Sequence, residues 1–334
     1  MKISFIRFDA PLKASLITID EDIHLKAGDV LIASEYSVIS AGTEVANLKG
    51  LPNTSGQFPW HPGYCGSGRI LEVGSEVENL KAGDRVITNW AGHRSHVVKK
   101  AATVTKINDD CIDLLDAAFA QIAAFSFLGV RKLKIELGES AMIIGQGILG
   151  AFATQIAKLS GALPLIVTDF DPKRRELALQ LGADYVFAPD EENLSDKIKE
   201  VSDGKGVDAI VEVSGVAAAL QQALECVAWQ GRVSLLGCTR IPDVNIDFYQ
   251  YVHRRGITLI GAHTFTRPRI DSRQGEWTEQ DDYRTFLKFL AAGKIQTKPL
   301  ISEIVSPADA TEIYLKLAEM KNPPLGIVFD WKNI

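Results

Sequence analysis

The chain has few cysteines and no long apolar run, and each shortage excludes a class of protein. Its four cysteines stand at positions 65, 111, 226 and 238, and none forms a Cys-x-x-Cys pair. Structural zinc knuckles use such pairs, so the sequence argues against one. Scattered cysteines are typical of the reducing cytoplasm. No stretch reaches the roughly 20 apolar residues of a membrane span, and the N-terminal residues do not form a signal peptide pattern. We therefore expect a cytoplasmic protein.

An excess of positive charge is also missing. The formal net charge is −6, which argues against nucleic acid as a partner, because binding there depends on neutralising phosphates. The length of 334 residues suits two domains of ordinary size. A hydrophobic content of 46% is typical of a globular protein whose core needs no disulfide or metal.

Two different patterns meet near residue 122. Before it, short β-type runs separated by glycine turns are typical of a β-rich domain. After it, apolar runs alternate with helical segments, which predicts a parallel sheet with helices on both faces. The expected strands are residues 140–144, 163–168, 207–213, 232–236 and 257–261. The expected helices between them are residues 149–159, 172–181 and 217–228.

A glycine-rich turn follows the first of these strands. Gly145, Gly147 and Gly150 form a Gly-x-Gly-x-x-Gly motif that opens a helix at Ile148 and Leu149. The first glycine permits a tight turn, the second lets the backbone approach a pyrophosphate, and the third allows close helix–strand packing. The phosphates would then lie at a helix N-terminus, whose N–H groups favour an anion. The motif therefore predicts a dinucleotide site.

Asp169 bears on which dinucleotide binds, because it ends the next expected strand. A carboxylate at that position accepts hydrogen bonds from the adenosine ribose hydroxyls and repels the 2′-phosphate of NADP. Lys173 and Arg174 follow closely and would favour a 2′-phosphate instead. On balance we expect NAD as the cofactor. The alternative for Asp169 is a helix cap or a turn carboxylate.

Four further segments carry a resemblance to a known family. They are residues 40–44 (SAGTE), 61–66 (HPGYCG), 82–86 (AGDRV) and 231–237 (GRVSLLG). With the order of the two patterns, they resemble the medium-chain dehydrogenase/reductase superfamily over nearly the whole chain. The resemblance implies an α/β protein in two domains: a Rossmann doubly wound parallel sheet in residues 122–263, and a β-rich GroES-like catalytic domain in residues 1–121 and 264–334. It also implies that Gly237 and Cys238 lie beside the nicotinamide, and that two copies pair as a homodimer through the edge strand at residues 257–261.

The departures from this family concern its zinc. The resemblance puts Ala41 at the position of the first catalytic ligand and Tyr64 at that of the histidine ligand, and the third ligand falls near Ala120 or Gln121. The cysteine-rich lobe that holds a structural zinc is missing. Alanine has no donor atom, and tyrosine is a poor zinc ligand at neutral pH. The sequence therefore predicts that no metal is bound. A rebuilt metal site would have to come from His61, Cys65 and Glu44.

Hydride transfer without zinc needs another group to polarise the substrate oxygen or to take its proton. By resemblance, Thr43 occupies the position of the family's proton-relay hydroxyl, and Tyr64 faces the same cleft. A tyrosine beside a positive nicotinamide ring can have its pKa lowered toward working pH. Glu44 could orient either hydroxyl or act as the base. Each residue also has a structural alternative: Tyr64 as a packed aromatic ring, Thr43 as a turn hydroxyl bonded to the backbone, and Glu44 as a salt-bridged carboxylate.

The expected substrate contacts are Trp90, His263 and Trp277. Trp90 aligns with an apolar wall of the family's substrate pocket, and its alternative is a core position. The segment 263–283 is polar and contains Trp277, and its arginines and hydroxyls suit a hydroxylated ligand. Thr278, with Asp281 three residues later, predicts the capped start of a helix. His93 and His96, in the shortened loop, fit surface or structural roles better than catalysis.

The expected function is hydride transfer between NAD and a secondary alcohol, with a sugar, glycoside or polyol as substrate. Three alternatives remain open at this point. One is an NADPH-dependent quinone or enone reductase, and the second is an alcohol dehydrogenase that acts on a pigment. The third is an inactive relative that still binds the cofactor.

Overall fold

The structure, a computed structural model, describes residues 1–240 and 245–334. The chain divides into a central unit, Ala123–Asp282, and a flanking unit formed by Met1–Ile122 and Tyr283–Ile334. The first boundary agrees with the sequence pattern. The second differs, because residues 264–282, which we expected in the catalytic domain, belong to the central unit. The buried Arg267 holds this segment there, since it donates to the carbonyl of Ala124 and pairs with Asp282.

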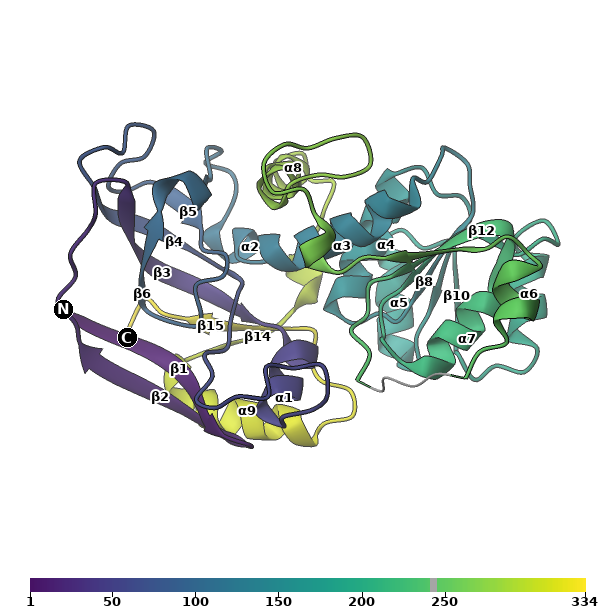
Figure 1. Cartoon of the computed structure of the whole chain (residues 1–334), viewed down its shortest axis with the longest axis horizontal. Helices are drawn as coiled ribbons and strands as arrows, with labels where there is room; N and C mark the ends of the chain where they lie inside the picture. Colours follow the sequence, from purple (N-terminus) through teal and green to yellow (C-terminus); the bar gives the residue numbers. More distant parts are fainter. Residues whose placement is uncertain (241–244) are drawn as a thin grey trace. The chain divides into compact units, whose positions relative to one another are not determined.

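The central unit is built on a six-stranded parallel sheet with the order β10-β9-β8-β11-β12-β13 (Figure 1). This is the strand order of a dinucleotide-binding Rossmann fold. The strands are β8 (Ala141–Ile144), β9 (Leu165–Thr168), β10 (Tyr185–Phe187), β11 (Val207–Glu212), β12 (Val227–Leu235) and β13 (Thr258–Gly261). The helices are α4 (Ile148–Leu159), α5 (Pro172–Gln180), α6 (Leu194–Glu200) and α7 (Ala217–Cys226). Each expected strand and helix is present within two residues of its predicted bounds, except that β12 begins at Val227, five residues before the predicted start and within the predicted helix 217–228.

The apolar runs explain why these strands form. Every residue of β8 and β9 is buried, because helices cover both faces of a parallel sheet. Helix α4 packs against β8 and β9, α5 against β9 and β10, and α7 against β11 and β12. The core beneath α6 and α7 includes Met142, Ile166, Ile210 and Leu224.

The flanking unit is mainly antiparallel. Its larger sheet has the order β14-β15-β3-β4-β5-β7, with β6 paired to β3, and a separate ribbon joins β1 to β2. The strands are β1 (Lys2–Ala10), β2 (Lys13–Asp20), β3 (Asp29–Ile39), β4 (Gly66–Val73), β5 (Arg85–Ile87), β6 (His96–Lys100), β7 (Thr105–Lys106), β14 (Ile301–Val305) and β15 (Gly326–Asp330). The helices are α1 (Ala41–Leu48), α2 (Leu114–Ala117) and α9 (Ala310–Glu319), and α3 (Ala120–Leu133) and α8 (Glu279–Ala291) cross the unit boundaries. A core of Phe8, Ile39, Tyr314 and Phe329 joins the ribbon, β3, β15 and α9.

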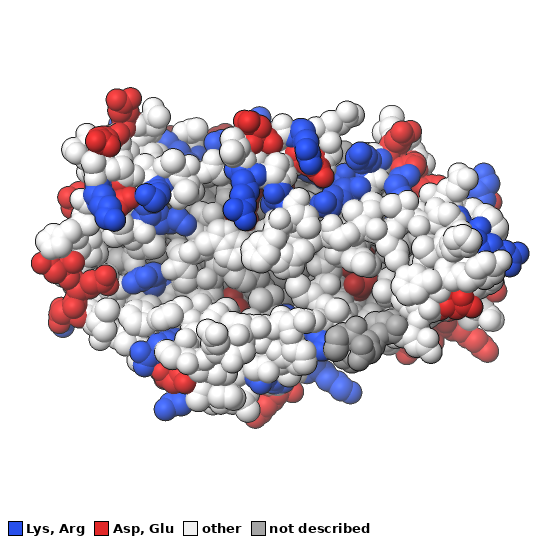
Figure 2. Space-filling model, in the orientation of Figure 1, with Lys and Arg blue, Asp and Glu red and all other residues white. Residues whose placement is uncertain are grey.

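The surface carries charges of both signs. On the face drawn in Figure 2, basic and acidic side chains are interspersed on each unit, as expected for a net charge of −6. No helix among the described residues is long and apolar enough to cross a membrane.

Candidate active site

Three hydroxyl groups meet where α1 begins. Ser40 is the N-cap of α1, Thr43 lies in its first turn, and Tyr64 comes from the segment that precedes β4. The phenol hydroxyl of Tyr64 is hydrogen-bonded to the side chains of both Ser40 and Thr43. We call these three residues the hydroxyl cluster. Thr43 and Tyr64, both predicted as catalytic, are therefore brought together, and Ser40 is a member that the sequence analysis missed.

In the protein without a bound cofactor, the surroundings of Tyr64 raise the pKa of its phenol. Burial raises the pKa of Tyr64 well above its ordinary value, and the neighbouring Cys65 and Glu44 raise it further. Hydrogen bonds from Ser40 and Thr43 act in the opposite direction but are outweighed. Burial has this effect because a phenolate in this site would lack solvent. The lowering that we expect from a nicotinamide ring concerns the protein with its cofactor bound and stays a prediction. Tyr64 is a proton donor at neutral pH.

Glu44 lies inside the protein rather than at a surface. Its carboxylate is fully buried and accepts hydrogen bonds from His93 Nε2 at 3.0 Å, from the backbone N–H of Ser40 at 2.9 Å and from the hydroxyl of Tyr314. This arrangement lets Glu44 orient the hydroxyl cluster, which was one of its two predicted roles. Its burial does not suit the other role, direct proton removal from a substrate.

Trp90 has an unusual backbone and an exposed ring. Its backbone φ is +53°, which lies in a region that residues other than glycine rarely adopt. The ring is 48% exposed, and its centroid lies 5.4 Å from that of Tyr64. The exposure excludes the core position that was its structural alternative. It leaves a large apolar surface next to the hydroxyl cluster.

The glycine turn of the central unit has the geometry that the motif predicts. Gly145 adopts a φ of +94°, and α4 starts directly after Gly147. A Cβ added at Gly150 would lie 2.9 Å from the carbonyl carbon of Gly145 and closer still to its oxygen, so only glycine fits there. A Cβ added at Gly147 would meet no atom within 4 Å. The second glycine thus borders open space at the helix N-terminus, with the half-buried Ile148 and Leu149 beginning the helix.

Asp169 lies just after β9, beside this turn. One carboxylate oxygen accepts the backbone N–H of Gln146 at 2.7 Å, and the other accepts that of Asp171 at 2.8 Å. The turn and the carboxylate are therefore fixed against each other. The N-cap of α5 is Asp171, which excludes helix capping as the role of Asp169.

Gly237 and Cys238 follow β12. Gly237 donates its N–H to the carbonyl of Glu212 at 2.9 Å, and Cys238 is exposed. A Cβ at Gly237 would collide with the backbone of Gly215, so the two turns touch. Glu212 itself holds the β11 turn, because its carboxylate accepts the backbone N–H groups of Ser214 and Gly215. Burial raises the pKa of Glu212, and those hydrogen bonds only partly offset it. Sequence analysis did not identify Glu212.

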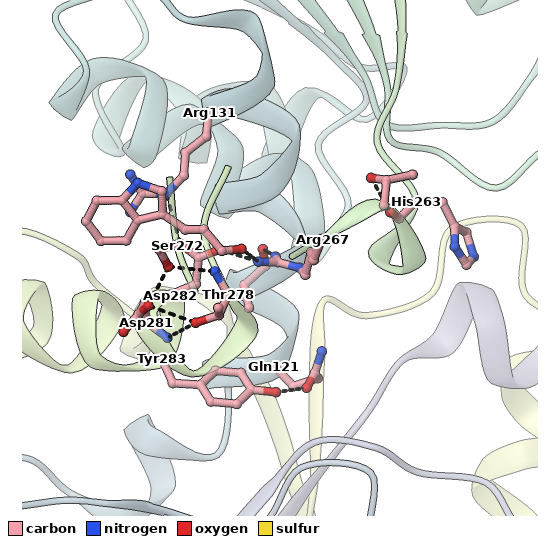
Figure 3. Close-up of polar contacts among 12 residues, drawn as sticks. Gln121, Arg131, His263, Arg267, Ser272, Thr278, Asp281, Asp282 and Tyr283 are labelled. Atoms are coloured by element: carbon pink, nitrogen blue, oxygen red, sulfur yellow. Dashed lines mark hydrogen bonds and ion pairs between the residues drawn. The ribbon is translucent and has the colours of Figure 1, made fainter. Parts of the chain in front are cut away.

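The polar segment 264–282 pairs with itself, as Figure 3 shows. Arg267 bonds Asp282 and the carbonyl of Trp277, Ser272 bonds Asp281, and Arg273 pairs with Glu276. Thr278 bonds the carboxylate of Asp281 at 2.8 Å, which confirms the predicted capped helix start. Three of the groups expected to bind a hydroxylated ligand are thus already satisfied.

Trp277 and His263, the two predicted substrate contacts of this segment, each make a contact within the protein. The guanidinium of Arg131 lies over the ring of Trp277, 3.8 Å from its centroid, so one ring face is covered. That contact removes one of the two faces that could stack on a sugar. His263 is exposed and caps a short turn, since its Nδ1 accepts the N–H of Phe265 at 3.3 Å.

The residues that the resemblance puts at or near zinc positions, Ala41, Tyr64 and Gln121, have surroundings that the structure describes. Ala41 has no donor atom, and the hydroxyl of Tyr64 is engaged in the hydroxyl cluster. Gln121, near the third position, accepts a hydrogen bond from the hydroxyl of Tyr283 (Figure 3). Among residues 1–240 and 245–334, no group of three His, Cys, Asp or Glu side chains could hold a metal ion. The rebuilt combination therefore does not assemble within that part of the chain.

Comparisons with known proteins identify the family. The model of the alcohol dehydrogenase GroES-like domain matches residues 26–154, and that of the zinc-binding dehydrogenase matches residues 149–291. L-threonine 3-dehydrogenase of Pyrococcus abyssi is 38% identical, over 72% of this chain and 73% of that protein. D-guloside 3-dehydrogenase of Escherichia coli K12 is 26% identical, over 78% and 75% respectively. An NADP-bound structure from Sinorhizobium meliloti 1021, assigned as a zinc-binding dehydrogenase, matches 99% of both chains at a TM-score of 0.83 and 20% identity.

The chain belongs to the zinc-type alcohol dehydrogenase family of the medium-chain dehydrogenase/reductase superfamily. It is an alcohol dehydrogenase-like oxidoreductase that acts on a small molecule and uses a nicotinamide dinucleotide. The predicted fold, a GroES-like domain with a Rossmann sheet, is confirmed.

Proposed function

We propose that this protein is an NAD-dependent dehydrogenase that oxidises a secondary hydroxyl group without catalytic zinc. The observation that carries the proposal is the hydroxyl cluster of Ser40, Thr43 and Tyr64, in which Tyr64 stands at the position that the resemblance gives to a histidine ligand of zinc. Protein zinc sites need thiolate, imidazole or carboxylate ligands, and this cluster supplies only hydroxyls. The reaction then depends on proton transfer through those hydroxyls.

The raised pKa of Tyr64 defines its role. In the direction of carbonyl reduction, Tyr64 donates a hydrogen bond and then a proton to the substrate oxygen. In the direction of alcohol oxidation, Tyr64 takes the proton of the substrate hydroxyl as its own phenol proton passes to the hydroxyl of Thr43 or Ser40. That hydroxyl in turn releases its proton to water, which the partly exposed Thr43 can reach. A bound nicotinamide ring supplies the hydride acceptor. Glu44 contributes by orientation, because its side chain, in the first turn of α1, is fully buried.

NAD is the preferred cofactor in this proposal. The Asp169 carboxylate is fixed beside the glycine turn by the N–H groups of Gln146 and Asp171. A 2′-phosphate at that point would face a negative charge that cannot easily move away. Dissociation constants for NADH and NADPH test this, and tighter or equal NADPH binding contradicts it.

The proposed substrate is a sugar, glycoside or polyol. The support is the exposed ring of Trp90 beside the hydroxyl cluster, which can stack on the C–H face of a sugar ring, and the similarity to D-guloside 3-dehydrogenase. The segment 264–282 supports it less than expected, because Arg267, Ser272 and Arg273 are paired within the segment. The higher identity to L-threonine 3-dehydrogenase makes threonine, also a secondary alcohol, the competing substrate.

The test is NADH formation with a panel of glucosides, free sugars, polyols, L-threonine and simple secondary alcohols. A higher kcat/KM for threonine or for simple alcohols rejects the carbohydrate substrate. Tyr64→Phe should lower kcat by roughly 10²- to 10⁴-fold, the range typical of a lost general acid. Tyr36→Phe, which removes a phenol bonded to Lys332 on the surface of the same unit, is the matched control and should leave kcat unchanged.

Metal analysis completes the test. Dialysed protein should contain far less than one zinc per chain, and a chelator should leave turnover unchanged. Stoichiometric zinc together with chelator-sensitive turnover would contradict the metal-free mechanism. No turnover with any alcohol, despite NAD binding, would instead identify an inactive relative.

A further inference from the structure

A line of hydrogen bonds runs through the interior of the flanking unit and ends at Glu44. The indole Nε1 of Trp331 lies 2.8 Å from Ser37 Oγ, and Ser37 Oγ lies 2.7 Å from His93 Nδ1. His93 Nε2 lies 3.0 Å from Glu44 Oε2. All four side chains are at most 3% exposed, so water does not compete for these contacts.

The donor chemistry of these groups determines the direction of the line. An indole N–H can only donate, so Ser37 Oγ accepts from Trp331. A serine hydroxyl has a single proton, and the partner that remains for it is His93 Nδ1. That nitrogen is therefore the acceptor, and the ring proton belongs on Nε2, where it points at Glu44. In the opposite tautomer the proton would be on Nδ1. The hydroxyl proton of Ser37 would then be buried without this acceptor, and an unprotonated Nε2 would face the Glu44 carboxylate.

We propose that His93 is a positioning residue for the hydroxyl cluster, held by Trp331 and Ser37 as the Nε2–H tautomer that orients Glu44. This inference rests on the proposed function of the cluster. Glu44 Oε2 accepts from His93 and from Tyr314, while Oε1 accepts the backbone N–H of Ser40. The carboxylate thereby holds the first turn of α1, which carries Ser40 and Thr43. His93 thus acts on Tyr64 through two intervening groups and touches no substrate.

The kinetic test compares two substitutions of His93. His93→Leu removes both nitrogen atoms while keeping an apolar side chain in the core. His93→Gln retains an N–H donor for Glu44 and an acceptor for Ser37. We expect His93→Leu to lower kcat roughly 10- to 100-fold with the KM for the alcohol and the Kd for NADH within about twofold, and His93→Gln to recover most of the loss. Equal losses in both variants, or none in either, would overturn the proposal.

A second measurement does not depend on turnover. Nitrogen-15 chemical shifts of labelled histidine report which ring nitrogen is protonated, and His93→Gln assigns the signal. We expect an unprotonated Nδ1 and a protonated Nε2 in the wild type. Trp331→Phe removes the donor that orients Ser37, and should allow the other tautomer to appear. A wild-type His93 protonated on Nδ1 would overturn the proposal.

Amide hydrogen exchange then tests the positioning itself. The N–H of Ser40, which donates to Glu44, should exchange faster in His93→Leu than in the wild type and should be protected again in His93→Gln. Unchanged exchange in both variants would overturn the positioning role. If no alcohol is oxidised by the wild type, the proposed function fails, but the tautomer and the exchange of Ser40 still decide the inference about His93.

Discussion

The two later glycines of the Gly-x-Gly-x-x-Gly turn should respond to alanine in opposite ways. At Gly147 an added methyl group enters open space, whereas at Gly150 it collides with the backbone of Gly145. The first change should therefore impair cofactor binding and spare the fold. The second should impair the fold.

The magnitudes follow from the local geometry. Gly147 has a φ of −64°, which alanine adopts without strain. The gain of about 0.4–1 kcal/mol from a less flexible unfolded chain is offset by the poorer capping of alanine, so stability should change by less than about 0.5 kcal/mol. A pyrophosphate kept away from the helix N-terminus loses at least one charged hydrogen bond, worth about 1.5–3 kcal/mol. That corresponds to a roughly 10- to 150-fold weaker Kd.

Gly150→Ala should cost more in stability, because the colliding atoms belong to the backbone. Overpacking of this kind costs about 1–3 kcal/mol, and more where nothing can relax. The assay pairs NADH titration by fluorescence with thermal unfolding for both variants. Gly28→Ala is the matched control, since an added Cβ there also meets no atom within 4 Å but lies in the flanking unit. It should change neither measurement.

One result would refute this reasoning. If Gly147→Ala binds NADH within about twofold of the wild type while remaining folded, the open space at Gly147 is not where a pyrophosphate approaches. A loss of stability in Gly147→Ala equal to that in Gly150→Ala would likewise contradict the separation of roles.

Three further predictions concern stability and assembly. Burial acts to raise the pKa of Asp84, but Lys106, whose Nζ lies 2.8 Å from Asp84 Oδ1, and the backbone N–H and charge of Lys81 together outweigh it and lower that pKa. A carboxyl group whose pKa is lowered in the folded state stabilises the protein at pH values above its pKa in the unfolded chain, about 3.9, and this stabilisation is lost as the pH falls through the folded-state pKa. The difference in unfolding free energy between the wild type and Asp84→Asn should therefore shrink below about pH 4. A difference that grows instead would contradict this. Asp282→Asn should leave Arg131 and Arg267 facing a neutral amide and lower the free energy of unfolding by about 3–5 kcal/mol. It should also expose residues 264–282 to limited proteolysis, and cleavage at the wild-type rate would contradict this. We expect a homodimer that pairs through the edge strand β13, and light scattering that gives a monomer at micromolar concentration would exclude it.

Local patterns were sufficient for most of the fold. The runs at β8, β9 and β11 are wholly or almost wholly buried, so their apolar composition alone marks them as parallel strands. The glycine turn could also be predicted from the sequence, because its backbone accepts only glycine at two positions. Gly145 has a positive φ, and a Cβ has no room at Gly150. The pairing of Thr43 with Tyr64 came from aligning two motifs with the family, since their contact is not visible in the spacing of the residues.

Only the tertiary structure determined which partners the charged and hydrogen-bonding side chains have. The arginines and hydroxyls of residues 264–282 are consistent with a ligand site as a sequence, but Arg267 finds Asp282 and Ser272 finds Asp281 only once the segment has folded. The partners of Glu44 are another case, since His93 and Tyr314 come from positions 49 and 270 residues away in the chain. The pKa of Tyr64 depends in the same way on burial, which no single-sequence pattern reports. Composition and periodicity determine which backbone forms, because those signals are local, whereas the protonation and orientation of polar groups depend on neighbours that only the folded chain brings together.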